Sequence, residues 1–170
     1  PGGFYLGNSA AERVWQTQSG KAQIAVNALP EAIVPYDIRA LTDNRIFVLQ
    51  TLRSHDQYNT TVYGYEDRYR GISGERKVLL MNEKDIESLR MENGDWVDVE
   101  SLWPDNVERK VFGFKLVAYD MPQGNAAAYF PEANPLVPLA SVGEHSGTPT
   151  SKSIAIVVTP AQNMPMATHS

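Results

Sequence analysis

Cysteine is absent from all 170 residues of the sequence, which excludes disulfides, iron–sulfur ligation and thiolate metal sites within the chain. No apolar run approaches the ~20 residues that a membrane-spanning helix needs. Long runs of one charge sign are also missing, and the net charge of −5 is unlike the basic balance typical of nucleic-acid-binding domains. We therefore expect neither a membrane nor a nucleic acid as a partner.

The residues that are present have the composition of an ordinary globular domain, with 42% hydrophobic and 21% charged residues. The length suits one domain, with room for a tail. The chain begins at Pro1 rather than Met, and its first residues resemble loop material, so we expect it to be a piece of a longer protein. The lack of cysteine is compatible with the cytoplasm, which is the location we expect.

Strand-like segments dominate the chain from residue 45 onward, and several alternate apolar and polar residues. These segments are 45–51, 76–81, 96–101, 107–119 and 153–158. Between them, 82–89 is predicted to be a short helix, because Asn82 is a good N-cap and Ile86 and Leu89 share one face. The pattern predicts a mainly β domain with short helices, in the form of a closed barrel or sandwich.

The two ends of the chain lack this pattern. Residues 1–40 are expected to be extended, with a turn at Ser19–Gly20 between two short strands and a linker from Ala28 to Pro35. Residues 41–160 form the predicted barrel, and 161–170 are predicted to be a flexible tail.

One long segment after the first strand, Thr51–Lys77, has no regular apolar period although it holds four tyrosines and four arginines. Loops of this length are uncommon unless they are functional or disordered, and the tyrosines argue against disorder. Arginines match phosphate oxygens and aromatic rings stack on heterocycles, so the segment suits a phosphorylated ligand with planar rings. The alternative is a surface loop packed on its own tyrosines.

Two later segments are also candidates for ligand contact. Met121–Leu139 is rich in proline and small residues, and Ala126–Ala128 is predicted to open a helical turn. Ser146–Ser153 combines hydroxyls, a glycine and Lys152, which can form a small anion site. The alternatives are an ordered connection for the first segment and a polar turn for the second.

Catalytic and metal-binding motifs are missing. His55, His145 and His169 have no metal-ligand spacing, and no nucleophile elbow, P-loop or dinucleotide fingerprint occurs. No pair of carboxylates stands out as an acid–base couple. We therefore assign no catalytic residue and no metal ligand within this chain.

These segments, in this order, resemble the C-terminal molybdopterin-dinucleotide-binding domain of formate dehydrogenase alpha subunits and related molybdenum oxidoreductases of the DMSO reductase family. The resemblance covers about residues 14–160 and any one of its strings alone would be weak. The strings that carry it are Thr51–Thr61, Asp67–Gly71, Met81–Ile86 with Gly94–Val97, Gly124–Leu136 and Thr148–Lys152.

The resemblance implies a double-psi β-barrel that closes over two molybdopterin guanine dinucleotides, whose dithiolenes hold molybdenum or tungsten. It also implies upstream domains of the same polypeptide as partners, and a small-molecule substrate in the complete enzyme. The implied reaction is a two-electron oxidation, with formate as the expected substrate, and the fragment alone is not expected to be active. The metal chemistry would belong to the cofactor, while the protein supplies position and electrostatics.

The same resemblance assigns cofactor contacts to polar and aromatic residues of the three loop segments. They are Arg53, Ser54, His55, Tyr58, Asn59, Thr60, Arg70, Tyr129, Asn134 and Lys152.

Three alternatives stay open from the sequence. The chain could be a stand-alone β-barrel that binds a ligand or a protein without redox activity. It could be an independent hydrolase or decarboxylase, although it has no nucleophile, no acid–base pair and no Gly-Ser dipeptide for pyruvoyl formation. The parent could also be a formate-dehydrogenase-like protein that has lost activity.

Overall fold

The computed structural model describes residues 2–55, 57 and 64–162 of the chain. The chain divides into two compact units, Pro1–Ile33 and Val34–Ser170. In the first unit the predicted turn is present, since the Gly20 amide donates to the Thr17 carbonyl at 3.0 Å. The two short strands predicted beside it are wrong, because the described residues 2–33 contain no strand. An isolated hairpin is marginal in water unless further strands or a helix pack on it.

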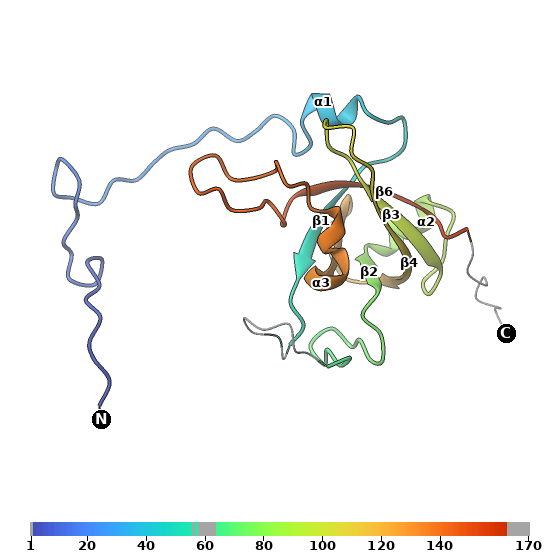
Figure 1. Cartoon of the computed structure of the whole chain (residues 1–170), viewed down its shortest axis with the longest axis horizontal. Helices are drawn as coiled ribbons and strands as arrows, with labels where there is room; N and C mark the ends of the chain where they lie inside the picture. Colours follow the sequence, from blue (N-terminus) through green and yellow to red (C-terminus); the bar gives the residue numbers. More distant parts are fainter. Residues whose placement is uncertain (1, 56, 58–63, 163–170) are drawn as a thin grey trace. The chain divides into compact units, whose positions relative to one another are not determined.

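The second unit is built on a closed six-stranded barrel (Figure 1). Around the barrel the strands follow the order β1-β5-β2-β4-β3-β6. β1 is parallel to β5 and β2 is parallel to β4, and the other neighbours are antiparallel. The strands are β1 (Phe47–Leu52), β2 (Val78–Met81), β3 (Trp96–Ser101), β4 (Arg109–Ala118), β5 (Asn125–Tyr129) and β6 (Ile154–Pro160). The predicted fold class, a mainly β double-psi barrel with short helices, is confirmed.

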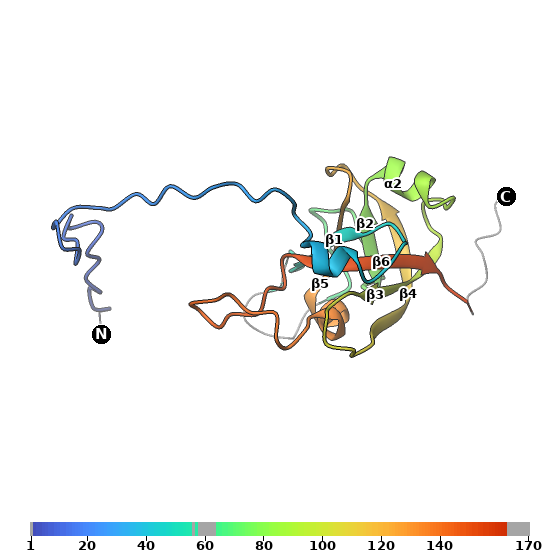
Figure 2. The same cartoon turned by 90° about the horizontal axis from the view of Figure 1, so that it is seen from above.

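One short helix precedes the first strand of the barrel, and the other short helices lie between strands. They are α1 (Tyr36–Arg39), α2 (Glu83–Ser88), α3 (Phe130–Ala133) and the 3-10 turn η1 (Asn134–Leu136). The helix predicted over 82–89 is confirmed, because the Asn82 side chain caps α2 by accepting from the Lys84 amide at 3.0 Å. Figure 2 shows α2 on the outside of the barrel.

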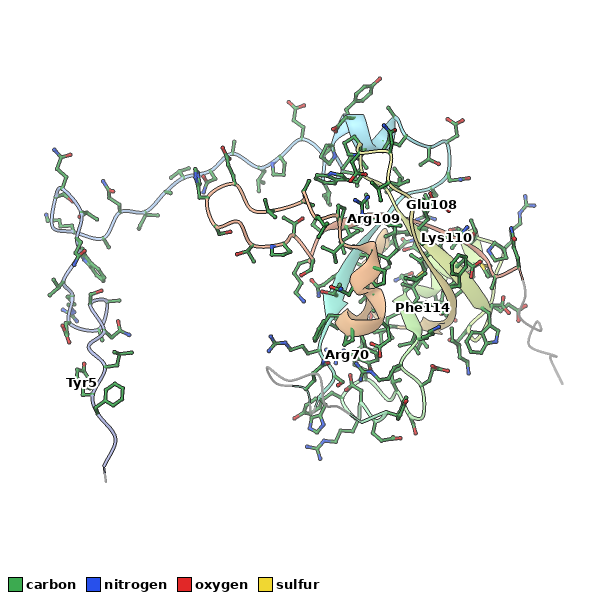
Figure 3. The ribbon with its side chains drawn as sticks, in the orientation of Figure 1. Tyr5, Arg70, Glu108, Arg109, Lys110 and Phe114 are labelled. Carbon is green, nitrogen blue, oxygen red and sulfur yellow. The ribbon has the colours of Figure 1, made fainter. Side chains whose placement is uncertain are left out.

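The core lies inside the barrel, where apolar side chains from all six strands meet. Phe47, Leu49, Leu79 and Leu116 have no exposed surface, and Phe114 of β4, labelled in Figure 3, is 1% exposed. Each such side chain contributes about 1.5–3 kcal/mol on burial. Inward positions are spaced two residues apart along most strands, as the alternating sequence pattern predicts.

β5 is the strand that the sequence did not reveal. Ala126–Ala128 was predicted to begin a helical turn, and this prediction is wrong: the three alanines are a strand paired with β1 on one side and β2 on the other. Alanine prefers helices when no tertiary contact intervenes, but pairing with two neighbouring strands outweighs that preference.

A second apolar cluster anchors the long connection between β1 and β2 to the outside of the barrel. Ile72 of the connection packs with Val78, Leu80, Ala127 and Tyr129. An isolated antiparallel β-bridge joins Asp67 to Ile72 within the connection. The described part of this segment is therefore attached to the barrel wall and held close to the end of β1.

Candidate functional site

The end of β1 lies where several connections meet (Figure 1). Thr51, next to the last residue of β1, donates its amide to the Ser151 carbonyl at 3.0 Å. The Lys152 ammonium donates to the Thr51 carbonyl, and its Nζ lies 3.4 Å from the Thr51 hydroxyl oxygen. These contacts join the segment before β6 to the end of β1, although the two are 101 residues apart in sequence.

A cavity of about 350 Å³ opens beside this junction, and we call it the Asn134 cavity. Two cations, an amide and three hydroxyls line it, with no carboxylate among its lining residues. Phe130 and Val137 contribute apolar wall. The polar lining consists of Thr51, Arg53, Asn134, Thr148, Ser151 and Lys152. Hydrogen-bond donors of this kind without a negative charge suit a phosphate or pyrophosphate group.

The charge of Lys152 is unfavourably placed in the chain itself. Partial desolvation lowers the pKa of its ammonium, and the nearby positive charge of Arg53 lowers that pKa further. The described hydrogen-bond partners of Lys152 are both oxygens of Thr51, which carry no charge. An anionic ligand between Arg53 and Lys152 would relieve this repulsion.

Asp67 organises the connection between β1 and β2. Its carboxylate is 1% exposed and accepts from Arg70 Nη1 at 2.6 Å and from the Tyr129 hydroxyl at 2.8 Å. Arg70 Nη1 also donates to the Arg53 carbonyl at 3.2 Å. Asp67 thus holds the Arg53 backbone in position through Arg70. Figure 3 labels Arg70 in the segment between β1 and β2.

The electrostatics of this group follow from its contacts. Burial opposes the charge of Asp67, but the hydrogen bonds from Arg70 and Tyr129, with the Arg70 charge, outweigh it and lower the pKa of Asp67. Burial and the adjacent carboxylate raise the pKa of Tyr129 well above its usual range. Asp67 is therefore ionised and Tyr129 is neutral near neutral pH, which lets the hydroxyl donate to the carboxylate.

Replacing Asp67 with asparagine is expected to lower the free energy of unfolding by about 2 kcal/mol at pH 7, because two hydrogen bonds to a charged acceptor become weaker. Urea denaturation of the chain measures this value. The folded pKa of Asp67 lies below 3.8, so its contribution is complete above that pH and is lost as the pH falls through the folded pKa.

The difference in free energy of unfolding between wild type and Asp67→Asn should therefore become smaller in acid. The control is Glu66→Gln, a neighbouring exposed carboxylate that accepts from the Ser73 hydroxyl and should change stability little. If the difference in free energy of unfolding between wild type and Asp67→Asn stayed constant from pH 7 to pH 2, the role of Asp67 as an ionised hydrogen-bond acceptor would be contradicted.

The structure gathers some of the residues predicted to contact a cofactor and separates others. Arg53, Asn134 and Lys152 line the Asn134 cavity. Arg70 lines a different cavity that also includes Lys152. Tyr129 is buried, with its hydroxyl on Asp67 and the Arg76 guanidinium 4.3 Å from its ring centre. In this structure Tyr129 therefore supports the barrel wall beneath the loop.

The remaining predicted contacts lie in the loop that follows β1. Ser54 is buried and forms a turn with Gln57, which donates its amide to the Ser54 carbonyl at 3.1 Å. His55 packs edge-on against the Tyr69 ring, with ring centres 4.3 Å apart. Tyr58, Asn59 and Thr60 lie outside the described residues, so the predictions for them stay predictions.

Thr51, Thr148 and Ser151 are cavity residues that the sequence prediction did not single out. Thr51, Thr148 and Ser151 all stand within the strings quoted for the family resemblance, so a signal for them existed. Thr51 is the last residue of the predicted strand and the first of the candidate loop, but its position in the cavity depends on Lys152 approaching from the far end of the chain.

Gln57 adds a buried hydrogen-bond donor to the loop after β1. Its side chain is 5% exposed and its Oε1 accepts from the Ser54 amide at 3.3 Å. Its Nε2 is buried and has no hydrogen-bond partner among the described residues. A buried donor without an acceptor is unfavourable, and an oxygen-rich ligand at this loop would satisfy it.

Within the described ranges 2–55, 57 and 64–162, no group of three or more His, Asp or Glu side chains could hold a metal ion. No helix in the same ranges is long and apolar enough to cross a membrane.

Comparison with known proteins finds one matching family model and several similar proteins. The family model described as "Molydopterin dinucleotide binding domain" matches residues 47–165. An uncharacterized oxidoreductase of Mycobacterium bovis, Mb2924c, is 48% identical over 165 residues, which cover 94% of this chain and 20% of that protein. Protein YdeP of Escherichia coli K12 is 40% identical over 163 residues, covering 95% of this chain and 21% of that protein. The chain thus spans about a fifth of the length of these relatives.

Proposed function

We propose that the barrel of this chain binds the pyrophosphate and pterin region of a molybdopterin dinucleotide in a larger oxidoreductase. The premise is that the chain belongs to the family of molybdopterin-dinucleotide-binding domains. The Asn134 cavity and the loop after β1 would form the contact surface. The observation that carries this proposal is the Asn134 cavity itself, in which Arg53 and Lys152 lie beside hydroxyl and amide groups without a carboxylate among the lining residues.

The chemistry of this lining fits the cofactor. Arg53 can donate two parallel hydrogen bonds to phosphate oxygens, and Lys152 adds a compact positive charge. Asn134 and the hydroxyl of Ser151 can complete the donors around a pyrophosphate. The buried Gln57 amide provides a further donor in the adjacent loop. When bound, the cofactor would supply the metal-centred two-electron chemistry, and the residues of this chain would bind and orient it.

The finer proposal concerns the complete protein. We propose that two such dinucleotides hold molybdenum or tungsten there, that the other domains of the same polypeptide cover most of the cofactor, and that formate is the substrate. Support for an oxidoreductase comes from the name of the mycobacterial relative. Support for formate comes from the resemblance of the loop strings to formate dehydrogenase alpha subunits.

The binding proposal is tested on the complete polypeptide, purified from a host that makes the cofactor. Elemental analysis should find molybdenum or tungsten, and acid hydrolysis should release guanine nucleotide in a fixed ratio to the metal. Protein that is folded but contains neither would overturn the binding proposal.

The substrate is tested separately. Formate-dependent reduction of an artificial electron acceptor by the loaded protein would support formate oxidation. Loaded protein that leaves formate unchanged would overturn the substrate proposal and leave the cofactor assignment intact.

A further inference from the structure

A second cavity, with a volume of about 410 Å³, lies on the outer face of the barrel, and we call it the Gln50 cavity. Its floor is apolar and consists of outward-facing side chains of three adjacent strands, with Leu52 on β1, Leu80 on β2 and Ala127 on β5. The segment between β4 and β5 forms another wall, with Met121 and Pro122. Cavities of this size and lining are typical of sites for small organic molecules.

The charged side chains that line the Gln50 cavity are all positive. Arg70 and Lys152 both line it, and none of its lining residues is an aspartate or glutamate. The chain as a whole carries a net charge of −5, so a positive pocket is a local departure from the rest of the protein. A positive cavity in an acidic protein favours anions over neutral molecules of the same shape.

Both cations have hydrogen-bonding capacity to spare. In its hydrogen bonds with the described residues, Arg70 donates through Nη1, to the Asp67 carboxylate and to the Arg53 carbonyl. A guanidinium has five N–H donors in total. Asp67 offsets part of the Arg70 charge, but it does not line the cavity. Lys152 has no carboxylate partner among the described residues, where its ammonium donates to the two oxygens of Thr51.

The polar walls suit an organic rather than an inorganic anion. Gln50 is exposed at the middle of β1, and Asn125 stands at the start of β5 with its Nδ2 donating to the Pro122 carbonyl at 3.2 Å. A small inorganic ion would cover none of the apolar floor formed by Leu52, Leu80 and Ala127. An organic anion would bury that floor, at about 25 cal/mol for each Å² removed from water.

We propose that the Gln50 cavity is a binding site for a small organic carboxylate, whose charged group lies between Arg70 and Lys152 and whose apolar body covers the floor of the cavity. This site goes beyond the cofactor function. Arg70 and Lys152 are also among the residues predicted to contact the cofactor, but the apolar floor of the Gln50 cavity lies on the outer face of the barrel and lines no part of the Asn134 cavity. Lys152 lines both cavities, so the two sites share one positive charge.

The test uses the complete polypeptide with its natural cofactor content, with benzoate as the probe and neutral benzamide as its isosteric control. Titration calorimetry should show benzoate binding at least ~10-fold more tightly than benzamide, the effect of one charge-assisted hydrogen bond. Methyl-selective NMR locates the site. The methyl signals of Leu52, Leu80 and Ala127 should shift with benzoate, while those of Val137, in the Asn134 cavity, should not.

Two variants test the site, and the first of them leaves the ion pair between Arg70 and Asp67 in place. Gln50→Trp places a large side chain at an exposed position of the cavity wall and should abolish benzoate binding without disturbing the ion pairs. Arg70→Gln should weaken benzoate binding about tenfold and leave benzamide unchanged. Lys77→Gln, an exposed cation outside the cavity, is the matched control and should bind benzoate like the wild type.

Three results would overturn the proposal. One is equal affinity for benzoate and benzamide, and another is methyl shifts at Val137 instead of the Gln50 cavity. The third is benzoate binding only to cofactor-free protein, which would assign the Gln50 cavity to the cofactor. Metal and guanine nucleotide content, measured on the same samples, report separately on the proposed cofactor function.

Discussion

Replacement of Arg53 and Lys152 together by methionine is expected to lower the metal and guanine nucleotide content of the complete polypeptide at least ~10-fold. Each cation can make a charge-assisted hydrogen bond to a phosphate group, which contributes about 1.5–3 kcal/mol, and 1.4 kcal/mol corresponds to a tenfold change in affinity. Both side chains line the Asn134 cavity and both residues are exposed in the chain. The barrel should therefore fold normally in the variant.

The measurement is elemental analysis together with quantification of guanine nucleotide after acid hydrolysis, with circular dichroism as the check on folding. The matched control replaces Lys77 and Lys110 by methionine, which removes the same charge from positions outside both cavities. Equal cofactor content in the two double variants would show that net charge, and not the Asn134 cavity, governs retention of the cofactor.

Replacing Asp85 by alanine is expected to lower the free energy of unfolding of the chain by about 3 kcal/mol. Asp85 has no exposed surface, and its carboxylate accepts from the Gly124 amide at 2.6 Å and from the Arg45 guanidinium. Removing one partner of a buried ion pair costs about 3–5 kcal/mol, and the lower end applies because the Arg45 side chain is 43% exposed.

The position of Asp85 explains why the effect should spread beyond a single contact. It stands in the first turn of α2, where a negative charge is favourable, and it holds the turn that leads into β5. Gly124 has a φ of 80° in that turn, a conformation that side-chain-bearing residues rarely adopt. Asp85 thus helps to place a strand that pairs on both of its edges.

Urea denaturation monitored by tryptophan fluorescence measures the loss of stability. Glu87→Ala, an exposed substitution on the same helix, is the control and should change stability by no more than ~0.5 kcal/mol. If Asp85→Ala were as stable as Glu87→Ala, the contact between α2 and the turn before β5 would not contribute to folding.

Local features of the fold followed from the sequence wherever neighbouring residues determine them. Trp96–Ser101 alternates apolar and polar residues and is β3 with the same bounds. The helix at α2 followed from the Asn82 cap and the spacing of its apolar residues. The family resemblance added the barrel class and named Arg53, Asn134 and Lys152, which do share a cavity.

β5 and the two cavities could be identified only in the tertiary structure. The alanines of β5 have no strand signal of their own, because their conformation is set by β1 and β2 on either side. Tyr129 and Arg70 stand in strings that indicate ligand contact, yet both hydrogen-bond to the buried carboxylate of Asp67. A side chain's partners in a closed barrel come from distant parts of the chain, and sequence spacing does not record them.

The sequence by itself therefore determined the mainly β character of this protein, its short helix and the polar loop that follows its first strand. These depend on hydrophobic periodicity, capping and composition, all of which act between near neighbours. The tertiary structure decided that Lys152 reaches Thr51 across 101 residues and that this lysine lines two cavities. Closure of the barrel determines these long-range contacts, because it pairs β6 with β1 whatever the length of chain between the two strands.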